Sequence, residues 1–584
     1  MTPARRRSSF LSVVPLLLLA ASADAQADEL SLAWNGRVQS DLRFRVEDKG
    51  IGDYYDRTTL PAGVERNQNL FNLKLKANYG SFTGVASVDF VLNGYTGKLQ
   101  GIDALNDYTK VQPYRFEPQA LYIDAKDLLK GLDLRVGHQI VSWGAGDQFN
   151  PTNNLNANDL RDPLLFGRQQ ANFMVKADYW ISEKLSLSAV LVPIFKPALL
   201  PTSAALGVAD ASRLPFTSDT LRHRIEAESG LGATSLIGHP TVVGQVDTYV
   251  PDVRPENMQA AFRIAGQLGE QDLALSYYIG RTDFPQPFLN HVSQVKGAQC
   301  HPFDPTNCIQ GQLQQAVSLG YPRMHVYGFN ASGEFNPFKW ISDKIHGMGY
   351  RAEVALVVPS EATLKVESDE LKIAIPQPAG EYDYDGDGKP GGPTPRVVEP
   401  TPFVKWTLGL DYAFGEHVYT NVQWVHGLVD EYGAGDFIHQ GWAVRHSDIT
   451  SNPDDTLTKC VVPKDGTRCA REMLRARLGD YLVIGVDLKF LSDAALLRLF
   501  TIWDLSGYTE DAWDNKLKQR VQTHYNLFSK EGFSAVLYPE FSYNFGNGLE
   551  LGAGALVELG RSYTKFGDPA AGGSTVFTRG KFSF

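Results

Sequence analysis

Apolar and polar residues alternate along most of this chain, which is the period expected of β-strands whose two faces meet different surroundings. Phe71, Leu73 and Leu75, for example, alternate with Asn72 and Lys74. About eighteen such segments follow one another, and the connections between them alternate between short turns and long polar segments. The pattern predicts an all-β fold, a transmembrane antiparallel up-and-down barrel with short turns at one rim and long loops at the other.

The same period is found in a secreted β-sandwich or propeller, because alternation alone does not separate an inner face from an outer one. Two observations favour the membrane barrel. Charged residues oppose the apolar face on strand after strand, and the strand count is even, as in most bacterial barrels. No apolar run after the first 25 residues is long enough for a transmembrane helix.

The first 25 residues have the three parts of a secretory signal peptide. Arg5, Arg6 and Arg7 precede an apolar run over residues 10–20, and the small residues Ala23 and Ala25 offer a cleavage site. The run is too short for a membrane anchor. We therefore expect residues 1–25 to be removed on export and residues 26–584 to form a single barrel domain.

The last strand of the sequence places Phe582 and Phe584 on one face and Arg579 and Lys581 on the other. This ending resembles the assembly signal of bacterial outer-membrane β-barrels. The resemblance implies a location in the cell outer membrane, with its lipid and lipopolysaccharide as partners. It also implies recognition of the C-terminal strand by the barrel assembly machinery.

The charge of the chain excludes some classes of function. A formal net charge of −11 over 584 residues argues against nucleic acid as a partner.

The sequence contains no recognisable catalytic motif. It has no nucleophile elbow and no zinc-protease motif, and the histidines of the predicted strands are scattered singly: His138, His325, His417 and His426. We expect no enzymatic activity.

Four cysteines form two close pairs in polar, turn-rich segments. In an oxidising compartment they predict two local disulfides, Cys300–Cys308 and Cys460–Cys469. A zinc site is the alternative for the first pair, where His301 is adjacent, but no comparable ligand stands beside the second pair.

A glycine-rich segment follows the predicted strand over residues 134–142. Its glycines permit tight bends and its Asn-Pro and Asp-Pro steps end strands, so the segment is able to fold into the barrel and narrow it. The alternative is a loop that only caps itself with Asx-turns. The residues that we expect at a constriction are Trp143, Asp147, Asn150, Asp159 and Arg161.

This segment resembles a large, poorly characterised family of porin-like proteobacterial outer-membrane barrels. The matching features are Trp143-Gly144, Asn150-Pro151 and Asp159-Leu160, with His138 where arginine is commoner in the family. The resemblance implies a porin-like barrel and leaves the substrate open.

A second segment has oxygen ligands at alternating positions before a glycine, like the opening of an EF-hand calcium loop. Its candidate ligands are Asp383, Asp385 and Asp387, while Thr394 stands where the bidentate glutamate is usual. The alternative is a solvated acidic turn. Apart from calcium in this extracellular loop, we expect no cofactor.

Cationic residues slightly outnumber anionic ones among the charges predicted to face the interior. They favour polar or anionic solutes, although ion pairs that only brace the wall are the alternative. The predicted selectivity residues are Arg43, Arg45, Lys74, Lys76, Arg135, Arg263, Arg351 and Lys489.

The sequence therefore predicts a passive or gated outer-membrane channel. One alternative is a barrel that exports a polysaccharide or another polymer. Another is a sealed structural or adhesive barrel, because the longest loop, residues 196–257, is long enough to plug the pore.

Overall fold

The computed structural model describes most of the chain outside its N-terminus and several loops. The described residues are 30–51, 58–94, 114–201, 203–204, 241–296, 299–301, 304–309, 312–336, 347–361, 363–368, 396–434, 442–448, 471–514 and 519–584. The predicted signal peptide over residues 1–25 lies outside them.

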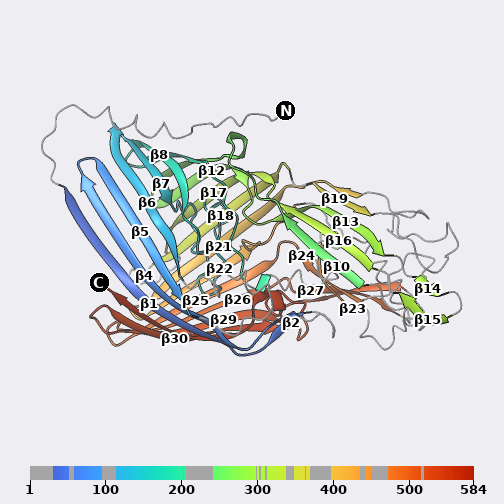
Figure 1. The fold of residues 1–584 in the computed structure, drawn as a ribbon. Helices are drawn as coiled ribbons and strands as arrows, with labels where there is room; N and C mark the ends of the chain where they lie inside the picture. The colour runs from blue at the N-terminus through green and yellow to red at the C-terminus, as the bar shows by residue number, and fades with distance from the viewer. Residues whose placement is uncertain are drawn as a thin grey trace, which may run out of the picture.

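Eighteen antiparallel strands form one closed sheet, which confirms the predicted all-β barrel (Figure 1). Neighbouring strands are consecutive barrel strands in the sequence, and the first strand pairs with the last. The barrel strands are β1 (Ser31–Arg45), β4 (Gly63–Tyr79), β5 (Phe82–Asn93), β6 (Tyr114–Leu129), β7 (Leu132–Gln139), β8 (Asn172–Ser182), β9 (Leu185–Val192), β11 (Gln259–Leu268), β12 (Gln271–Arg281), β17 (Arg323–Phe335), β18 (Met348–Pro359), β21 (Phe403–Phe414), β22 (Val418–His426), β25 (Asp480–Phe490), β26 (Ala495–Asp504), β29 (Ser534–Asn544), β30 (Leu549–Gly560) and β31 (Thr575–Ser583).

The C-terminal residue closes the barrel against β1. Phe584 and Gly36 exchange two backbone hydrogen bonds of 3.0 Å. The ring of Phe584 lies 5.9 Å from that of Trp34 and 6.2 Å from that of Phe71. A Cβ atom on Gly36 would come within 2.6 Å of the Phe584 ring, so this closure requires glycine at position 36.

The two faces of the barrel wall differ as the alternation predicts. On β12, Leu275 points outward and is 61 % exposed, whereas Tyr278 points inward and is buried. On β1, Phe44 points outward while Asp41 and Arg43 lie buried inside. Because a closed sheet pairs its backbone groups between neighbouring strands, an apolar outer face can lie in lipid without exposing them.

The two rims differ in the length of their connections. Short connections such as residues 80–81, 130–131 and 183–184 join strands at one rim, where both β1 and β31 also have their free ends. We call this the short-turn rim. Long connections, such as those that join β7 to β8 and β12 to β17, begin and end at the opposite rim, which we call the long-loop rim.

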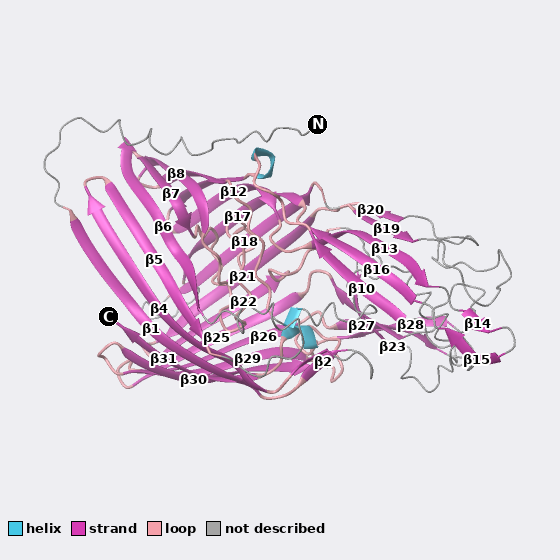
Figure 2. Ribbon diagram, viewed as in Figure 1, coloured by secondary structure: helices cyan, strands magenta, loops and turns pink. Residues whose placement is uncertain are grey.

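Much of the polypeptide beyond the long-loop rim forms further strands, where the sequence pattern predicts only long loops (Figure 2). These strands pair with one another, so the barrel pattern of one apolar and one polar face does not apply to them. Their sheets contain β10 (Thr241–Thr248), β16 (Gln312–Gly320), β13 (Gln286–Lys296), β19 (Leu364–Ser368) and β20 (Arg396–Val398); β14 (Gln299–His301) and β15 (Asp304–Ile309); β2 (Lys49–Ile51) and β3 (Thr58–Leu60); and β23 (Trp442–Asp448), β24 (Arg471–Ala476), β27 (Tyr508–Asp514) and β28 (Gln519–Tyr525).

Two short 3-10 helices, η4 (Pro255–Asn257) and η6 (Pro569–Ala571), complete the described elements. Within the described part of the chain, no helix is long and apolar enough to cross a membrane. Of the long segment over residues 196–257, β10 belongs to the five-stranded sheet beyond the rim, and residues 205–240 lie outside the described residues.

Candidate functional site

Residues 140–171, between β7 and β8, lie inside the barrel, and we call them the inner loop. The loop contacts β1 through Asp162 and β18 through Thr152. These two strands stand nearly opposite each other in the order of the closed sheet. The inner loop therefore crosses the lumen from wall to wall.

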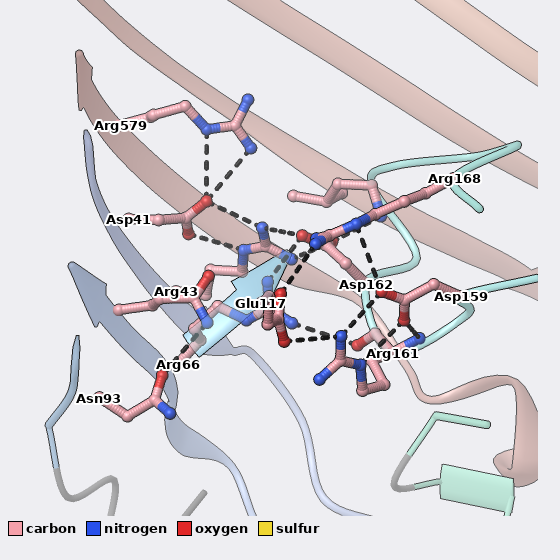
Figure 3. A network of polar contacts seen from close by, with 12 residues as sticks. Asp41, Arg43, Arg66, Asn93, Glu117, Asp159, Arg161, Asp162, Arg168 and Arg579 are labelled. Atoms are coloured by element: carbon pink, nitrogen blue, oxygen red, sulfur yellow. Dashed lines mark hydrogen bonds and ion pairs between the residues drawn. The ribbon is translucent and has the colours of Figure 1, made fainter. Parts of the chain in front are cut away.

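The first anchor of the inner loop is a buried ion-pair network at β1 and β4 (Figure 3). Arg43 donates two hydrogen bonds of 2.5 and 2.8 Å to the carboxylate of Asp162 and two of 2.7 and 2.8 Å to that of Asp41. Arg66 donates a 2.6 Å bond to Asp162, and Arg579 on β31 lies 3.2 Å from Asp41. The guanidinium of Arg43 thus bridges the barrel wall and the loop.

The electrostatics of Asp162 follow from this setting. Burial alone would raise the pKa of its carboxyl. The hydrogen bond from Arg43, the charges of Arg66 and Arg43, and the backbone N–H of Leu164 outweigh burial and hold the pKa well below its usual 3.8. Asp162 is therefore ionised at neutral pH and is compensated by two arginines.

A second anchor joins the inner loop to β6 (Figure 3). The carboxylate of Glu117 accepts hydrogen bonds from Arg115 at 2.6 Å, from Arg161 at 2.9 Å and from Arg168 at 3.1 Å. Asp159 in the loop accepts two further bonds from Arg161, and its carboxylate lies 3.3 Å from Arg168. Two loop arginines are thus shared between one wall carboxylate and one loop carboxylate.

The third anchor is Glu353 on β18, which is completely buried. One of its carboxylate oxygens accepts from the backbone N–H groups of Ala145 and Gly146 at 2.9 and 3.1 Å. The other accepts from the N–H and the hydroxyl of Thr152 at 2.8 and 2.7 Å. Gly144 has a φ of +127°, and a Cβ there would lie 2.8 Å from the carboxylate, so the Trp-Gly step needs its glycine.

A fourth set of contacts is made by Asp147. Its carboxylate pairs with Arg351 on β18, and the amide of Asn421 on β22 donates to it at 2.9 Å. Gln423 donates a longer bond of 3.4 Å to the same oxygen. Arg351 also lies 3.5 Å from Asp411, so it is shared between a loop carboxylate and a wall carboxylate.

Apolar side chains of the inner loop pack against the inner wall on both sides of these polar anchors. Trp143 and Leu155 belong to a buried cluster with Met174, Val326 and Ala355. The remaining apolar contacts form a second cluster, which contains Phe149, Leu164, Val425, Tyr481, Ile502 and Phe577. The loop is thus held by packing as well as by charge.

A cavity of about 530 Å³ lies between the inner loop and the inner wall nearer the short-turn rim. We call it the inner cavity. Leu164, Phe166 and Arg168 line it from the loop, and Tyr419, Arg498, Glu540 and Arg579 are among the residues that line it from the wall.

The structure separates the eight arginines and lysines predicted to tune selectivity into two groups. Five arginines lie on the inner face, and four of them are paired with a carboxylate. Arg43 is 2 % exposed, Arg45 donates a 2.6 Å bond to Glu65, and Arg351 pairs with Asp147. Arg135 lies 2.9 Å from Asp124. Arg263 on β11 is partly buried.

The three lysines form the other group. Lys74 and Lys76 on β4 and Lys489 on β25 are exposed on the inner face near the short-turn rim. Within the described residues, none of the three is in an ion pair. They, rather than the paired arginines, present uncompensated positive charge to water.

The five residues predicted for a constriction all lie in the inner loop. Trp143 is buried in the first apolar cluster, and Asp147, Asp159 and Arg161 make the polar contacts described above. The carbonyl of Asn150 accepts a hydrogen bond of 3.1 Å from the N–H of Asn153, which closes a turn.

Sequence reasoning missed Arg66, Glu117 and Arg168 as partners of the loop. They lie on β4, on β6 and near the end of the loop, and no spacing in the sequence relates them to one another. Their sequence surroundings offer no clear signal: Arg66, for example, stands between Glu65 and Asn67, as an ordinary lumenal charge would, and only its burial in the folded barrel requires a partner.

Several predictions concern residues that the structure does not describe in full. The candidate calcium ligands Asp383, Asp385 and Asp387 and the pair Cys460–Cys469 lie outside the described residues. Cys300 and Cys308 stand opposite each other in the backbone register of β14 and β15, and their disulfide stays a prediction. Among the described residues, no cluster of histidine, cysteine, aspartate or glutamate is suited to hold a metal ion.

No family model and no curated protein matches the chain. Solved structures with a similar outline include OccK9 (OpdG) of Pseudomonas aeruginosa, with a TM-score of 0.41, 8 % identity and coverage of 95 % of this chain and 98 % of that chain. OccAB3 of Acinetobacter baumannii gives a TM-score of 0.40 at 10 % identity, with coverage of 95 % and 99 %. The outer membrane channel DcaP of Acinetobacter baumannii gives 0.33 at 9 % identity, with coverage of 96 % and 99 %. At these values the likeness carries no functional argument.

Proposed function

We propose that this protein is an outer-membrane channel that conducts ions and small polar solutes past the inner loop. The observation that carries the proposal is the combination of a closed barrel, an apolar outer face and a charged loop tied across the lumen. The short-turn rim then faces the periplasm and the long-loop rim the outside of the cell, as in bacterial outer-membrane barrels.

The outer face supports placement in a bilayer. Large apolar side chains are exposed around the barrel, including Phe262, Leu275, Tyr327, Leu410 and Leu499. An exposed apolar surface of this extent would aggregate in water but is matched by lipid. Aromatic side chains at the short-turn rim, among them Trp34, Tyr79 and Phe584, suit the interface between lipid and water.

We further propose a preference for anions among small ions. Most inward arginines are neutralised by carboxylates, whereas Lys74, Lys76 and Lys489 are exposed at the rim that we assign to the periplasm. Exposed like charges at a pore mouth attract counter-ions, and the effect falls with ionic strength.

Planar-bilayer recording on the purified full chain tests both proposals. Stepwise conductance is expected, with a reversal potential in a salt gradient displaced toward that of the anion. Replacing Lys74 and Lys76 by glutamate should move the reversal potential toward the cation value, whereas Lys365→Glu, on the loop strand β19, should leave it unchanged. An absence of current under all conditions would contradict the channel proposal.

A sealed structural barrel is the second candidate, and the two apolar clusters around the inner loop favour it. It predicts no conductance. Export of a polymer requires a continuous charged track, whereas the described lumenal arginines are mostly paired with carboxylates. Block of the current by long polymers but not by small solutes would favour that alternative.

We also propose that the barrel assembly machinery recognises β31, with lipid and lipopolysaccharide as the surroundings of the folded barrel. Support comes from the outward placement of Phe582 and Phe584, both more than 40 % exposed at the short-turn rim. Removal of Phe584 should lower the fraction of protein that reaches the outer membrane. An unchanged fraction would contradict this role.

A further inference from the structure

The inner cavity has an even balance of charge. Its lining contains three carboxylates, Asp147, Asp487 and Glu540, and three guanidinium groups, which belong to Arg168, Arg498 and Arg579. A solute in this cavity therefore meets no excess of either sign. This differs from the inner face near the short-turn rim, where Lys74, Lys76 and Lys489 are exposed without an ion pair among the described residues.

The charges in the lining are also paired with one another or with the wall. Arg498 and Asp487 stand opposite each other on β26 and β25 and share two hydrogen bonds of 2.8 and 2.7 Å. Arg579 lies 3.6 Å from Glu540, and Arg168 lies 3.1 Å from Glu117. An ionic solute would have to compete with these pairs and lose part of its own hydration, which makes ion binding costly.

The remaining polar side chains of the lining are three amides, Gln148, Asn421 and Gln423, and the hydroxyls of two tyrosines. Gln148 and Gln423 line the cavity, and each has a buried side-chain oxygen without a hydrogen-bond partner. Protein atoms cover both oxygens, so a solute hydroxyl reaches them only if the amide turns toward the cavity, and that turn would pair an acceptor whose unsatisfied burial costs free energy. The carboxylates and guanidinium groups of the pairs also have further lone pairs and N–H groups for neutral hydroxyls.

Aromatic side chains complete the lining. Phe166 from the loop and Phe500 from β26 lie 5.3 Å apart, and Tyr419 and Tyr538 line the cavity from β22 and β29. Apolar faces beside planar, bidentate polar groups suit a molecule whose ring is apolar on its faces and rich in hydroxyls at its edge. The volume of about 530 Å³ lies within the range of roughly 300–1,000 Å³ that is usual for small-molecule sites.

We infer that the inner cavity is a binding site for an uncharged, polyhydroxylated solute of the size of a sugar. This inference rests on the proposed channel function for its biological role, since the site would select solutes that pass the inner loop. It names a class of solute that the charges at the rim do not indicate.

Three pyranose probes test the inference: glucose, glucuronate and glucosamine, which are neutral, anionic and cationic. Each is added to the full-chain protein in planar bilayers, and the concentration that halves the ion current is measured. Glucose should block at a concentration at least about tenfold lower than either charged analogue, a ratio that corresponds to 1.4 kcal/mol. Equal half-blocking concentrations for the three probes would overturn the inference.

Single substitutions in the Asp487–Arg498 pair sharpen the test. Arg498→Gln leaves the lining one charge negative and should shift the preference toward glucosamine, whereas Asp487→Asn should shift it toward glucuronate. The double variant restores neutrality and should lose both shifts while still binding glucose more weakly than the wild type. Ser542→Ala, on the inner face of β29 outside the lining, is the matched control and should change nothing.

If the protein carries no current, the channel proposal fails but the cavity remains testable. Isothermal titration calorimetry of the detergent-solubilised full chain with glucose should then give saturable heat that Arg498→Gln reduces. Heat that is absent, or that is identical in the wild type and this variant, would overturn the binding site itself.

Discussion

Arg43 on β1 and Asp162 in the inner loop are 119 residues apart in the sequence and share two hydrogen bonds of 2.5 and 2.8 Å. Both side chains are almost completely buried. The pair joins the first strand of the barrel to a loop that begins after β7. It therefore ties the barrel wall at β1 to a segment that lies four barrel strands further along the sequence.

Replacing Arg43 by methionine should lower the free energy of unfolding by about 3–5 kcal/mol, because Asp41 and Asp162 would remain as buried charges without their shared cation. Urea unfolding of the protein in lipid vesicles, followed by tryptophan fluorescence, measures the change. The control is Arg254→Met, since Arg254 and its partner Asp252 are both largely exposed, and it should cost less than about 1 kcal/mol. Equal losses in the two variants would contradict a buried anchor.

Glu353→Gln should loosen the inner loop without removing the side chain. Both carboxylate oxygens accept hydrogen bonds from the loop, and an amide would turn one acceptor into a donor that faces backbone N–H groups. The expected local cost is about 1–3 kcal/mol, seen as faster hydrogen exchange at the amides of Ala145, Gly146 and Thr152. The same exchange rates in the variant and the wild type would show that Glu353 does not hold the loop. Glu550→Gln, at the partly exposed pair with Lys581, is the control.

The depressed pKa of Asp162 predicts that its anchor is insensitive to pH in the neutral range. An acid whose pKa is lower in the folded protein than its unfolded value of 3.8 adds stability above that value. This stability is lost progressively as the pH falls from the unfolded value toward the lower, folded pKa. The difference in unfolding free energy between the wild type and Asp162→Asn should therefore stay constant from pH 8 to about pH 5 and shrink below about pH 4. A difference that shrinks between pH 8 and pH 6 would contradict the arginine-compensated carboxylate.

The assignment of outer and inner faces predicts opposite outcomes for one substitution at two sites on β26. Leu499 is exposed on the outer face, whereas Leu496 lies on the inner face between Lys489 and Ser542. Leu499→Arg should destabilise the barrel in lipid by about 2–4 kcal/mol, because an arginine then lies within hydrocarbon. In Leu496→Arg the new arginine faces the lumen, so the loss of unfolding free energy should be clearly smaller. If Leu496→Arg lowered the unfolding free energy in vesicles more than Leu499→Arg, the assignment of inner and outer faces would be wrong.

The fold could be predicted from the sequence because the alternation of a barrel strand is visible within the strand itself. Phe71, Leu73 and Leu75 alternate with polar residues whichever strand lies beside them. The alternation therefore indicates about eighteen strands without any knowledge of how the strands pair. The strands beyond the long-loop rim could not be predicted in this way. β10 and β16, for example, pair with each other outside the barrel and need no apolar outer face.

The site could be predicted only in part. The inner loop was visible in its glycines and Asn-Pro step, but its partners were not. Arg66, Glu117 and Glu353 lie on three different strands, and only the closed sheet brings them to one loop. For the same reason the prediction that Arg43 lines the lumen did not anticipate its burial, since Asp162 covers it from a distant part of the sequence.

If the inner loop narrows a conducting barrel, removing the loop must raise the single-channel conductance. The wild type is compared with a variant in which residues 145–168 are replaced by a Gly/Ser linker of equal length, after heat-dependent gel mobility has shown that both proteins are folded. We predict that the wild type conducts in discrete steps and that the variant conducts several-fold more. Equal conductance in the two proteins, or no current in either, would contradict the account.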